Sequence, residues 1–267
     1  MPNGTKRRVR TPFAESLDLP PPFRPVILRE SGDAFAHACA IASAEGAGTL
    51  VHVGRFDLAE FAVVLEPEQA LRTARRALYT GLCALGDALA VLAPPEKPIT
   101  FDWPDAIRVD GGLVGGVRLA WPQDAHEDKH PDWLVLGAMI RVTAAHEGEP
   151  GLAPFATTLV EEGFGELDCG RLAEGFARHL LANFDAEREH GFGETAHRYL
   201  MRVPPAPRRS LQIDGRGDLL VRIKGGAIGR RPLLPTLRAP SWLDPQTRCP
   251  HLHALPPGHA AERSAAP

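Results

Sequence analysis

Hydrophobic residues recur every three or four positions between Glu68 and Leu92 and make the clearest pattern in the chain. The stripe consists of Leu71, Ala74, Leu78, Leu82, Leu85, Leu89 and Leu92. This spacing places all of these side chains on one face of an α-helix. Proline cannot continue a helix, and Pro94 and Pro95 follow directly. The pattern therefore predicts one long helix with a buried stripe that ends before Pro94.

The same periodicity predicts three shorter helices, at residues 31–48, 167–189 and 193–202. Ser31 is a suitable N-cap for the first, because its hydroxyl can accept a hydrogen bond from a free amide of the first turn. The second turns a stripe of large apolar residues inward, made of Leu172, Phe176, Leu180 and Phe184.

Runs rich in β-branched and aromatic residues predict strands. They occupy residues 48–57, 60–67, 99–103, 106–110, 113–121 and 133–144. Several of these runs are joined by tight turns, including Gly111-Gly112, and tight turns favour antiparallel pairing. We therefore expect an α+β fold, with a mixed, mostly antiparallel sheet packed against helices and the long helix covering one side.

Changes in composition divide the chain. We expect a flexible, proline-rich leader at residues 1–22 and a main domain at 23–203, followed by a linker rich in proline and arginine. Short strands with tight turns at Asp214-Gly215 and Arg216-Gly217 predict a small β module at residues 210–245. The remaining residues, 246–267, are rich in proline, histidine and alanine and predict a disordered tail.

Composition and charge exclude several functions. With 44% hydrophobic and 24% charged residues the chain is an ordinary globular protein. A formal net charge of -3 leaves no basic excess to neutralise phosphates, so we expect no nucleic-acid partner. The start carries no secretory signal, no apolar run is long enough to span a bilayer, and the four cysteines form no CxxC pair. We therefore expect a cytoplasmic protein with reduced thiols and no membrane association.

Residue types that bind metals gather at residues 124–132 and 249–259. A structural zinc site needs four ligands held by a folded frame, and neither stretch offers one. We therefore expect no metal site in either stretch.

Trp103-Pro104-Asp105 and the pair Gly115-Gly116 are the strongest candidates for a ligand site. Pro104 fixes its φ angle and cannot extend a strand ladder, so Asp105 should project from a rigid corner. Glycine inside a strand indicates that another group approaches the backbone closely. The residues alone allow two interpretations, a pocket for an extended ligand or a hairpin corner with a β-bulge and no ligand.

The order of these segments resembles the catalytic domain of the biotin and lipoate protein ligase family over residues 24–202. That family carries a Trp-Pro-Asn-Asp segment, a Lys-x-x-Gly-Ile strand and a Gly-x-Gly-x-Asn-Val strand. The matching stretches here are Trp103-Pro104-Asp105, Leu113 to Val117 and Leu136 to Val142. The family's Thr-Ser-Leu segment is matched by Thr157-Thr158-Leu159.

The resemblance implies an enzyme that attaches or transfers biotin, a lipoyl group or an octanoyl group to a lysine of a carrier-protein domain. It implies ATP, with magnesium, and an acyl adenylate as the intermediate. It also implies that Asp105 accepts a polar ligand group or magnesium and that Arg55 closes over the ligand. The substrate-binding residues it implies are Trp103, Pro104, Gly115, Gly116, Arg118, Gly137 and Arg141.

The chain departs from the family pattern where charge matters. The family's hairpin lysine, which grips the acid and the α-phosphate, is Leu113 here, and leucine can do no electrostatic work. The lysine that precedes Trp-Pro in many members is Asp102, and the asparagine of the third segment is Arg141. The loop around Arg55, which closes over the adenylate in the family, is short.

Three interpretations stay open. In the first, the chain is an adenylating ligase in which Arg55, Arg118 or Arg141 replaces the lysine, since guanidinium suits carboxylate and phosphate. In the second, it transfers acyl groups without ATP through Cys169, which precedes a helix, with His52 or His146 as base. In the third, it is a non-catalytic relative that binds a cofactor or a carrier domain.

Overall fold

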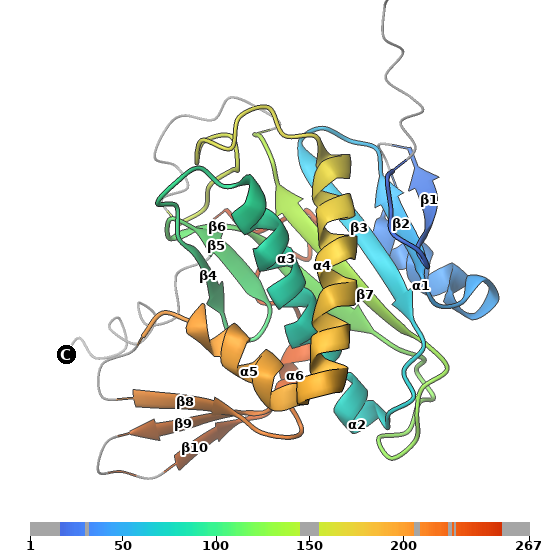
Figure 1. Ribbon diagram of the computed structural model, residues 1–267, viewed down its shortest axis with the longest axis vertical. Helices are drawn as coiled ribbons and strands as arrows, with labels where there is room; N and C mark the ends of the chain where they lie inside the picture. Colours follow the sequence, from blue (N-terminus) through green and yellow to red (C-terminus); the bar gives the residue numbers. More distant parts are fainter. Residues whose placement is uncertain are drawn as a thin grey trace, which may run out of the picture.

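The computed structural model describes residues 17–29, 32–144, 155–205, 209–223, 226 and 228–252. The main body is a seven-stranded sheet with helices on both faces, and a three-stranded sheet projects from one end of it (Figure 1). The predicted α+β class is confirmed. None of the helices that the structure describes is both long enough and apolar enough to cross a membrane.

The large sheet has the order β1-β2-β3-β7-β6-β5-β4. Its strands are β1 (Arg24–Leu28), β2 (Thr49–Val53), β3 (Leu58–Leu65), β4 (Ile99–Asp102), β5 (Ala106–Val109), β6 (Gly112–Ala120) and β7 (Leu134–Arg141). Among the strands that the structure describes, only β1 and β2 pair in parallel, and helix α1 (Ala34–Glu45) makes the crossover between them. The other described pairs of this sheet are antiparallel, which confirms the expected mixed sheet.

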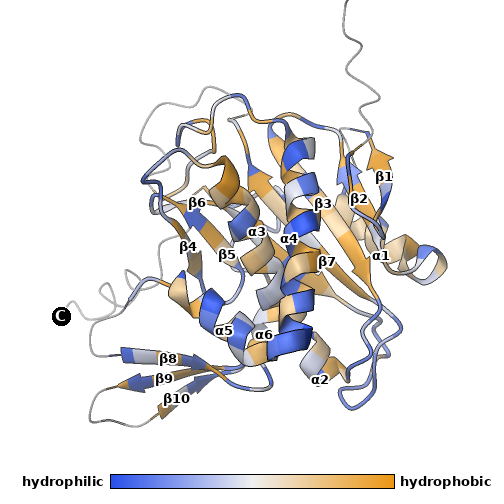
Figure 2. Cartoon of the chain, viewed as in Figure 1, coloured by the Kyte–Doolittle hydropathy of each residue, from blue (hydrophilic) through white to orange (hydrophobic). Residues whose placement is uncertain are grey.

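One face of the sheet, which we call the α3–α4 face, is covered by α3 (Ala77–Leu92) and α4 (Cys169–His190). These two helices lie side by side across the sheet, and α5 (Phe192–Met201) follows α4 (Figure 1). The main hydrophobic cluster fills this layer and includes Leu82, Phe61 and Phe176, all nearly inaccessible to solvent. Figure 2 shows hydrophobic residues along β3 and β7 and hydrophilic residues on the visible side of α4.

The opposite face, which we call the α1 face, has two covers. Over β2 and β3 the small residues Ala34, Ala38 and Ala42 of α1 let the helix pack closely. Over β5, β6 and β7 the cover is a segment from the end of the described chain, residues 240–252, which we call the C-terminal strap. The sequence assigned 246–267 to a disordered tail. Of that range the structure describes residues 246–252, and they belong to this strap.

The small sheet consists of β8 (Arg209–Ile213), β9 (Leu219–Ile223) and β10 (Ile228–Arg231), followed by α6 (Leu233–Leu237). The turn predicted between β8 and β9 is present, with the amide of Asp214 donating to the carbonyl of Asp218. Four residues of this module belong to the main hydrophobic cluster: Ile213, Leu219, Leu233 and Leu237. The module therefore shares the core of the main body.

The predicted long helix is interrupted, and this part of the prediction is wrong. Helix α2 (Leu71–Ala74) ends before Arg75, and α3 begins at Ala77. The Arg75 guanidinium is buried at the break and donates to both carboxylate oxygens of Glu127, at 2.8 and 2.7 Å. The Leu71 amide donates to the carbonyl of Lys129 in the same loop. The loop at 124–132 thus docks on the start of this helical region.

Helix α1 begins later than its sequence pattern indicated. Its N-cap is Asp33, whose carboxylate accepts a hydrogen bond from the Ala36 amide at 2.8 Å. Ser31, the predicted cap, lies outside the described residues. Strand β1, which the sequence pattern did not predict, lies just inside the predicted main domain.

Candidate functional site

The corner at Trp103 sends its indole toward the α3–α4 face. The Trp103-Pro104 peptide is cis, and the half-buried Trp103 ring packs against the main hydrophobic cluster. Its Nε1 donates to the Tyr79 hydroxyl at 2.9 Å, and that hydroxyl donates to the carbonyl of Gly217 at 2.5 Å. Trp103 therefore does not line the surface around Gly116.

Asp105 follows this corner and points toward the C-terminal strap. Its carboxylate is almost completely buried and accepts hydrogen bonds from Ser241, at 2.5 Å from the hydroxyl and 3.0 Å from the amide. Burial raises the pKa of Asp105 to about 6, although the bonds from Ser241 act in the opposite direction. The predicted acceptor thus already accepts from a residue of the same chain.

The register of the sheet shows which predicted residues share the α1 face. Residues paired across neighbouring strands point to the same side, so Glu60, Met139, Gly116 and Ala106 form one row. The adjacent rows contain Leu58 with Arg141, and Ala62 with Gly137 and Arg118. Gly116, Gly137, Arg118 and Arg141 are therefore brought together on one surface.

Gly115 has a different environment. It pairs with Ile107 and Ile140, which both pack into the main hydrophobic cluster. The β5–β6 register shifts between Ile107 and Arg108, as the interpretation with a β-bulge expected. Gly115 has φ +154°, and a Cβ there would overlap the carbonyl oxygen of Met139. The bulge and the close approach of β7 account for this glycine.

Gly116 lies beneath a side chain that the sequence patterns did not place there. A Cβ on Gly116 would overlap the carbonyl oxygen of Asp105 and the indole of Trp242. Trp242 is completely buried, and its Nε1 donates to the carbonyl of Val117 at 3.0 Å. Around the indole lie the apolar side chains of Leu58, Ala106, Leu113 and Met139. The sequence signal was a lone tryptophan in an otherwise polar, proline-rich segment.

The three arginines proposed as substitutes for the lysine differ in their partners. Arg55 makes a two-pronged ion pair with Asp57, at 2.8 and 2.7 Å. Arg118 lies 3.2 Å from Asp33 and 3.9 Å from Glu60, and its guanidinium stacks over the ring of Phe35. Both are therefore charge-compensated within the described structure.

Arg141 is less completely satisfied. Its Nη2 donates to the carbonyl of Pro250 in the strap, and its buried Nη1 has no hydrogen-bond partner among the described residues. Burial lowers the pKa of Arg141, although a guanidinium stays charged at neutral pH. Cys249 of the strap lies close enough to interact electrostatically with both Arg141 and Arg55. Arg141 thus has an unused donor on the α1 face.

Two other predicted positions serve packing. Gly137 lets the Phe35 ring of α1 approach, because a Cβ would overlap that ring. Leu113, at the position of the family lysine, is buried beneath Trp242. Asp102, at the position of the other lysine, is buried and accepts from Arg108 at 2.6 Å.

Cys169 lies at the first turn of α4, away from the α1 face. Its thiol is buried and 3.6 Å from the carbonyl of Phe56. Burial and the nearby carboxylates of Asp168 and Asp57 raise the pKa of Cys169 to about 12, so the thiol stays protonated at neutral pH. His52 is also buried, burial lowers its pKa, and its Nδ1 has no partner among the described residues. His146 lies outside the described residues.

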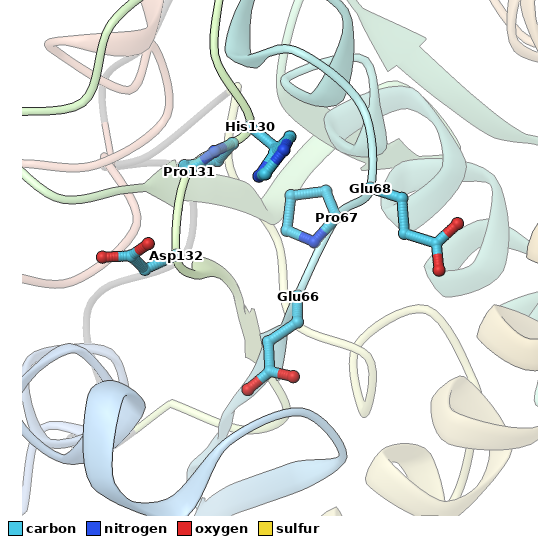
Figure 3. Close-up of a pocket in the computed structure, with 6 residues that line it drawn as sticks. All are labelled: Glu66, Pro67, Glu68, His130, Pro131 and Asp132. Atoms are coloured by element: carbon cyan, nitrogen blue, oxygen red, sulfur yellow. The ribbon is translucent and has the colours of Figure 1, made fainter.

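An open hollow of about 380 Å³ lies at the end of β3, far from these residues in the sheet. Figure 3 shows its lining, in which the carboxylates of Glu66, Glu68 and Asp132 point in different directions. Within the described ranges, no group of three or more histidine, cysteine, aspartate or glutamate side chains could hold a metal ion. His253 and His259 of the metal-ligand stretch near the C-terminus are not among the described residues.

Comparison with known proteins identifies the family. Residues 19–201 match the sequence model of the Biotin/lipoate A/B protein ligase family, and the chain belongs to that family. A biotin protein ligase-like protein of unknown function from Silicibacter sp. TM1040 has a similar structure, with a TM-score of 0.71 and 28% identity. The match covers 83% of this chain and 99% of that one. No curated protein matches the chain.

More distant similarities concern the fold alone. The biotin protein ligase of Aquifex aeolicus, solved in complex with biotin and ATP, has a TM-score of 0.60 at 16% identity, covering 77% of this chain and 94% of that one. The Leishmania major biotin protein ligase in complex with biotin has a TM-score of 0.52 at 19% identity, covering 79% and 98%.

Proposed function

We propose that this chain is an adenylating ligase that attaches biotin, a lipoyl group or an octanoyl group to a lysine of a carrier-protein domain. Family membership over residues 19–201 supports the reaction class. In this reaction the acid attacks the α-phosphate of ATP, pyrophosphate leaves, and the carrier lysine then takes the acyl group from the adenylate. We place the reaction in the cytoplasm, where the sequence predicts the protein to reside.

The observation that carries this proposal is the position of Arg141. It lies one row from Gly116 on the α1 face, and its Nη1 has no partner among the described residues. A fixed cation beside the reacting carboxylate and phosphate stabilises the negative charge that develops there. Guanidinium presents paired donors that match carboxylate and phosphate geometry. Arg141 would therefore take the role that Leu113 cannot perform.

The remaining site residues would bind and orient the acid. Gly116 has no side chain of its own above the sheet, so a ligand could lie there if the Trp242 indole were absent, and Arg55 lies at the edge of the same surface. Asp105 would accept a polar group of the ligand or hold magnesium once Ser241 no longer donates to it. A carboxylate oxygen is a suitable magnesium ligand.

One observation favours a second candidate, a non-catalytic relative that binds a cofactor or a carrier domain. The lysine position is filled by Leu113, which is buried under Trp242. The thiol route has no such support, because Cys169 is buried on the other side of the sheet and stays protonated.

The decisive experiment is acid-dependent exchange of labelled pyrophosphate into ATP, with biotin, lipoate and octanoate supplied in turn. We expect exchange with one of the acids. Arg141→Gln should lower the exchange rate at least about tenfold, which corresponds to about 1.4 kcal/mol of lost transition-state stabilisation.

Arg188→Gln is the matched control. Arg188 lies on α4 with 82% of its side chain exposed, so this variant should exchange at the rate of the unaltered chain. Folded protein that shows no exchange with any of the acids would rule out the adenylating ligase and leave the binding relative.

A further inference from the structure

The C-terminal strap folds back on itself. It leaves α6 through Arg238 and Ala239, which are both exposed. Within it, the amide of His251 donates to the carbonyl of Trp242 at 2.7 Å and the amide of Asp244 to the carbonyl of Cys249 at 2.9 Å. All four residues of the turn at 245–248 are exposed. The strap is therefore a locally closed unit attached to the body by a short exposed connection.

Three hydrogen bonds join the strap to the sheet at or beside the proposed ligand surface, and Arg248 of the strap also lies 4.0 Å from Asp33. Ser241 donates to Asp105, and the Trp242 indole donates to the carbonyl of Val117, which follows Gly116. The carbonyl of Pro250 accepts from Arg141. A carboxylate, a backbone carbonyl and a guanidinium that a ligand would need are thus occupied by residues of the same chain.

The apolar contacts of Trp242 are separate from the main core. Its cluster consists of Leu58, Ala106, Leu113 and Met139, with Leu243 and Cys249 partly buried beside it, and it does not merge with the cluster beneath α3 and α4. Removal of the strap would expose this cluster but leave the main core closed. Segments with few shared contacts open locally at a lower free energy than the whole protein.

We propose that the C-terminal strap is an internal occupant of the ligand site, and that Trp242 leaves its slot before a ligand binds beside Gly116. The identity of that ligand rests on the proposed function, whereas the release of the strap does not. The strap and the ligand compete for the same surface. The apparent affinity of the ligand therefore equals its intrinsic affinity multiplied by the fraction of molecules in which the strap is open.

The opposing interpretation is that Trp242 is a permanent part of the folded core. Hydrogen exchange of the full chain, read by mass spectrometry, separates the two. The informative amide is that of Ser241, which donates to Asp105 of the body in the closed strap, whereas the amides of Asp244 and His251 donate to carbonyls within the strap itself. A releasable strap should exchange the Ser241 amide at least about a hundredfold faster than the paired amides of β3 and β7. Exchange at the rate of β3 and β7 would overturn the proposal, because the strap would then open only when the whole protein unfolds.

Binding of biotin as the probe, measured by calorimetry on the full chain, tests the competition. Trp242→Ala should bind at least about tenfold more tightly than the unaltered chain, because the closed strap no longer fills the slot. Trp121→Ala is the matched control, since Trp121 packs against the main cluster and should leave the affinity unchanged. Ser241→Ala removes one hydrogen bond from the closed strap and should tighten biotin binding by about fivefold. This variant tests the same competition if Trp242→Ala does not fold.

The two proposals fail separately. If biotin binds the unaltered chain, equal or weaker binding by folded Trp242→Ala would contradict the proposed release of the strap. If the Ser241 amide exchanges rapidly but biotin, lipoate and octanoate bind neither protein, the strap is supported and the proposed ligase function is overturned. If biotin binds the unaltered chain, adding it should speed the exchange of the Ser241 amide, and the absence of that effect would also contradict the proposal.

Discussion

The two faces of the seven-stranded sheet are covered by different kinds of contact. The α3–α4 face is closed by large apolar side chains, among them Leu82, Phe61 and Phe176, that interlock in one continuous cluster. The α1 face is closed by small alanines on one half and by the C-terminal strap on the other. The first face is therefore stabilised by one large apolar cluster, and the second by two smaller apolar clusters together with hydrogen bonds from the strap.

Several charged residues on the α1 face or beside the strap are buried or partly buried, namely Glu60, Asp105, Arg118 and Arg141. Buried charge also occurs elsewhere, as at Arg75 between α2 and α3. Burial of a charge costs free energy unless partners compensate it fully, and Arg141 has an unpartnered nitrogen in the described structure. The α3–α4 face thus carries the larger apolar core, while the α1 face holds charged groups able to bind a polar ligand.

The largest effect is expected from a change on the α3–α4 face. Leu82 is completely buried between α3 and the sheet, and Leu82→Ala should lower the free energy of unfolding by about 3 to 5 kcal/mol, through lost burial and a cavity. Urea denaturation measures this change in the free energy of unfolding. Hydrogen exchange under native conditions, which compares the rate of the Ser241 amide of the strap with those of the β3 amides, is a second measurement. A loss below about 1 kcal/mol would break the assignment of stability to this face.

A smaller effect that depends on pH is expected at Asp105. Its folded pKa of about 6 is above the ordinary value of 3.8, so the folded protein binds the proton more readily than the unfolded chain between these pH values. Stability from this group therefore rises as the pH falls from 7 toward 4. The ionised form costs about 2 to 3 kcal/mol relative to the protonated form, and Asp105→Asn removes that dependence.

Denaturation of Asp105→Asn and of the unaltered chain at pH 7 and at pH 4.5 tests this. The difference in unfolding free energy between the two proteins should shift in favour of the unaltered chain at the lower pH. Differences that stay equal at both pH values would show that Asp105 has an ordinary pKa and is not buried by the strap.

The smallest effect is expected at Cys169. Cys169→Ala should lower the unfolding free energy by about 1 kcal/mol, since a small buried side chain is shortened. It should leave acid-dependent pyrophosphate exchange and carrier modification unchanged, because the thiol lies on the α3–α4 side and stays protonated. Loss of acyl transfer in a folded Cys169→Ala protein would contradict this and restore the thiol route.

Local periodicity was enough to predict most helices and strands, because each pattern depends on residues close in sequence. It failed at Arg75, where the helix is interrupted beside a buried ion pair. The partner, Glu127, lies 52 residues further along the chain. It also could not place Trp242 on Gly116, since that contact joins the end of the chain to its middle. The glycines indicated a close approach, but the sequence could not say that the approaching group belongs to the same chain.

The hydroxyl of Tyr79 joins the small sheet to the corner at Trp103, since it accepts from the Trp103 indole and donates to the carbonyl of Gly217. A chain shortened at Pro205 would leave this buried hydroxyl without its acceptor and would remove Leu219 and Leu233 from the shared core. The composition of the chain changes after Pro205, but we expect the parts before and after this point to unfold together. We expect the body and the small sheet to melt in a single transition, as one thermodynamic unit.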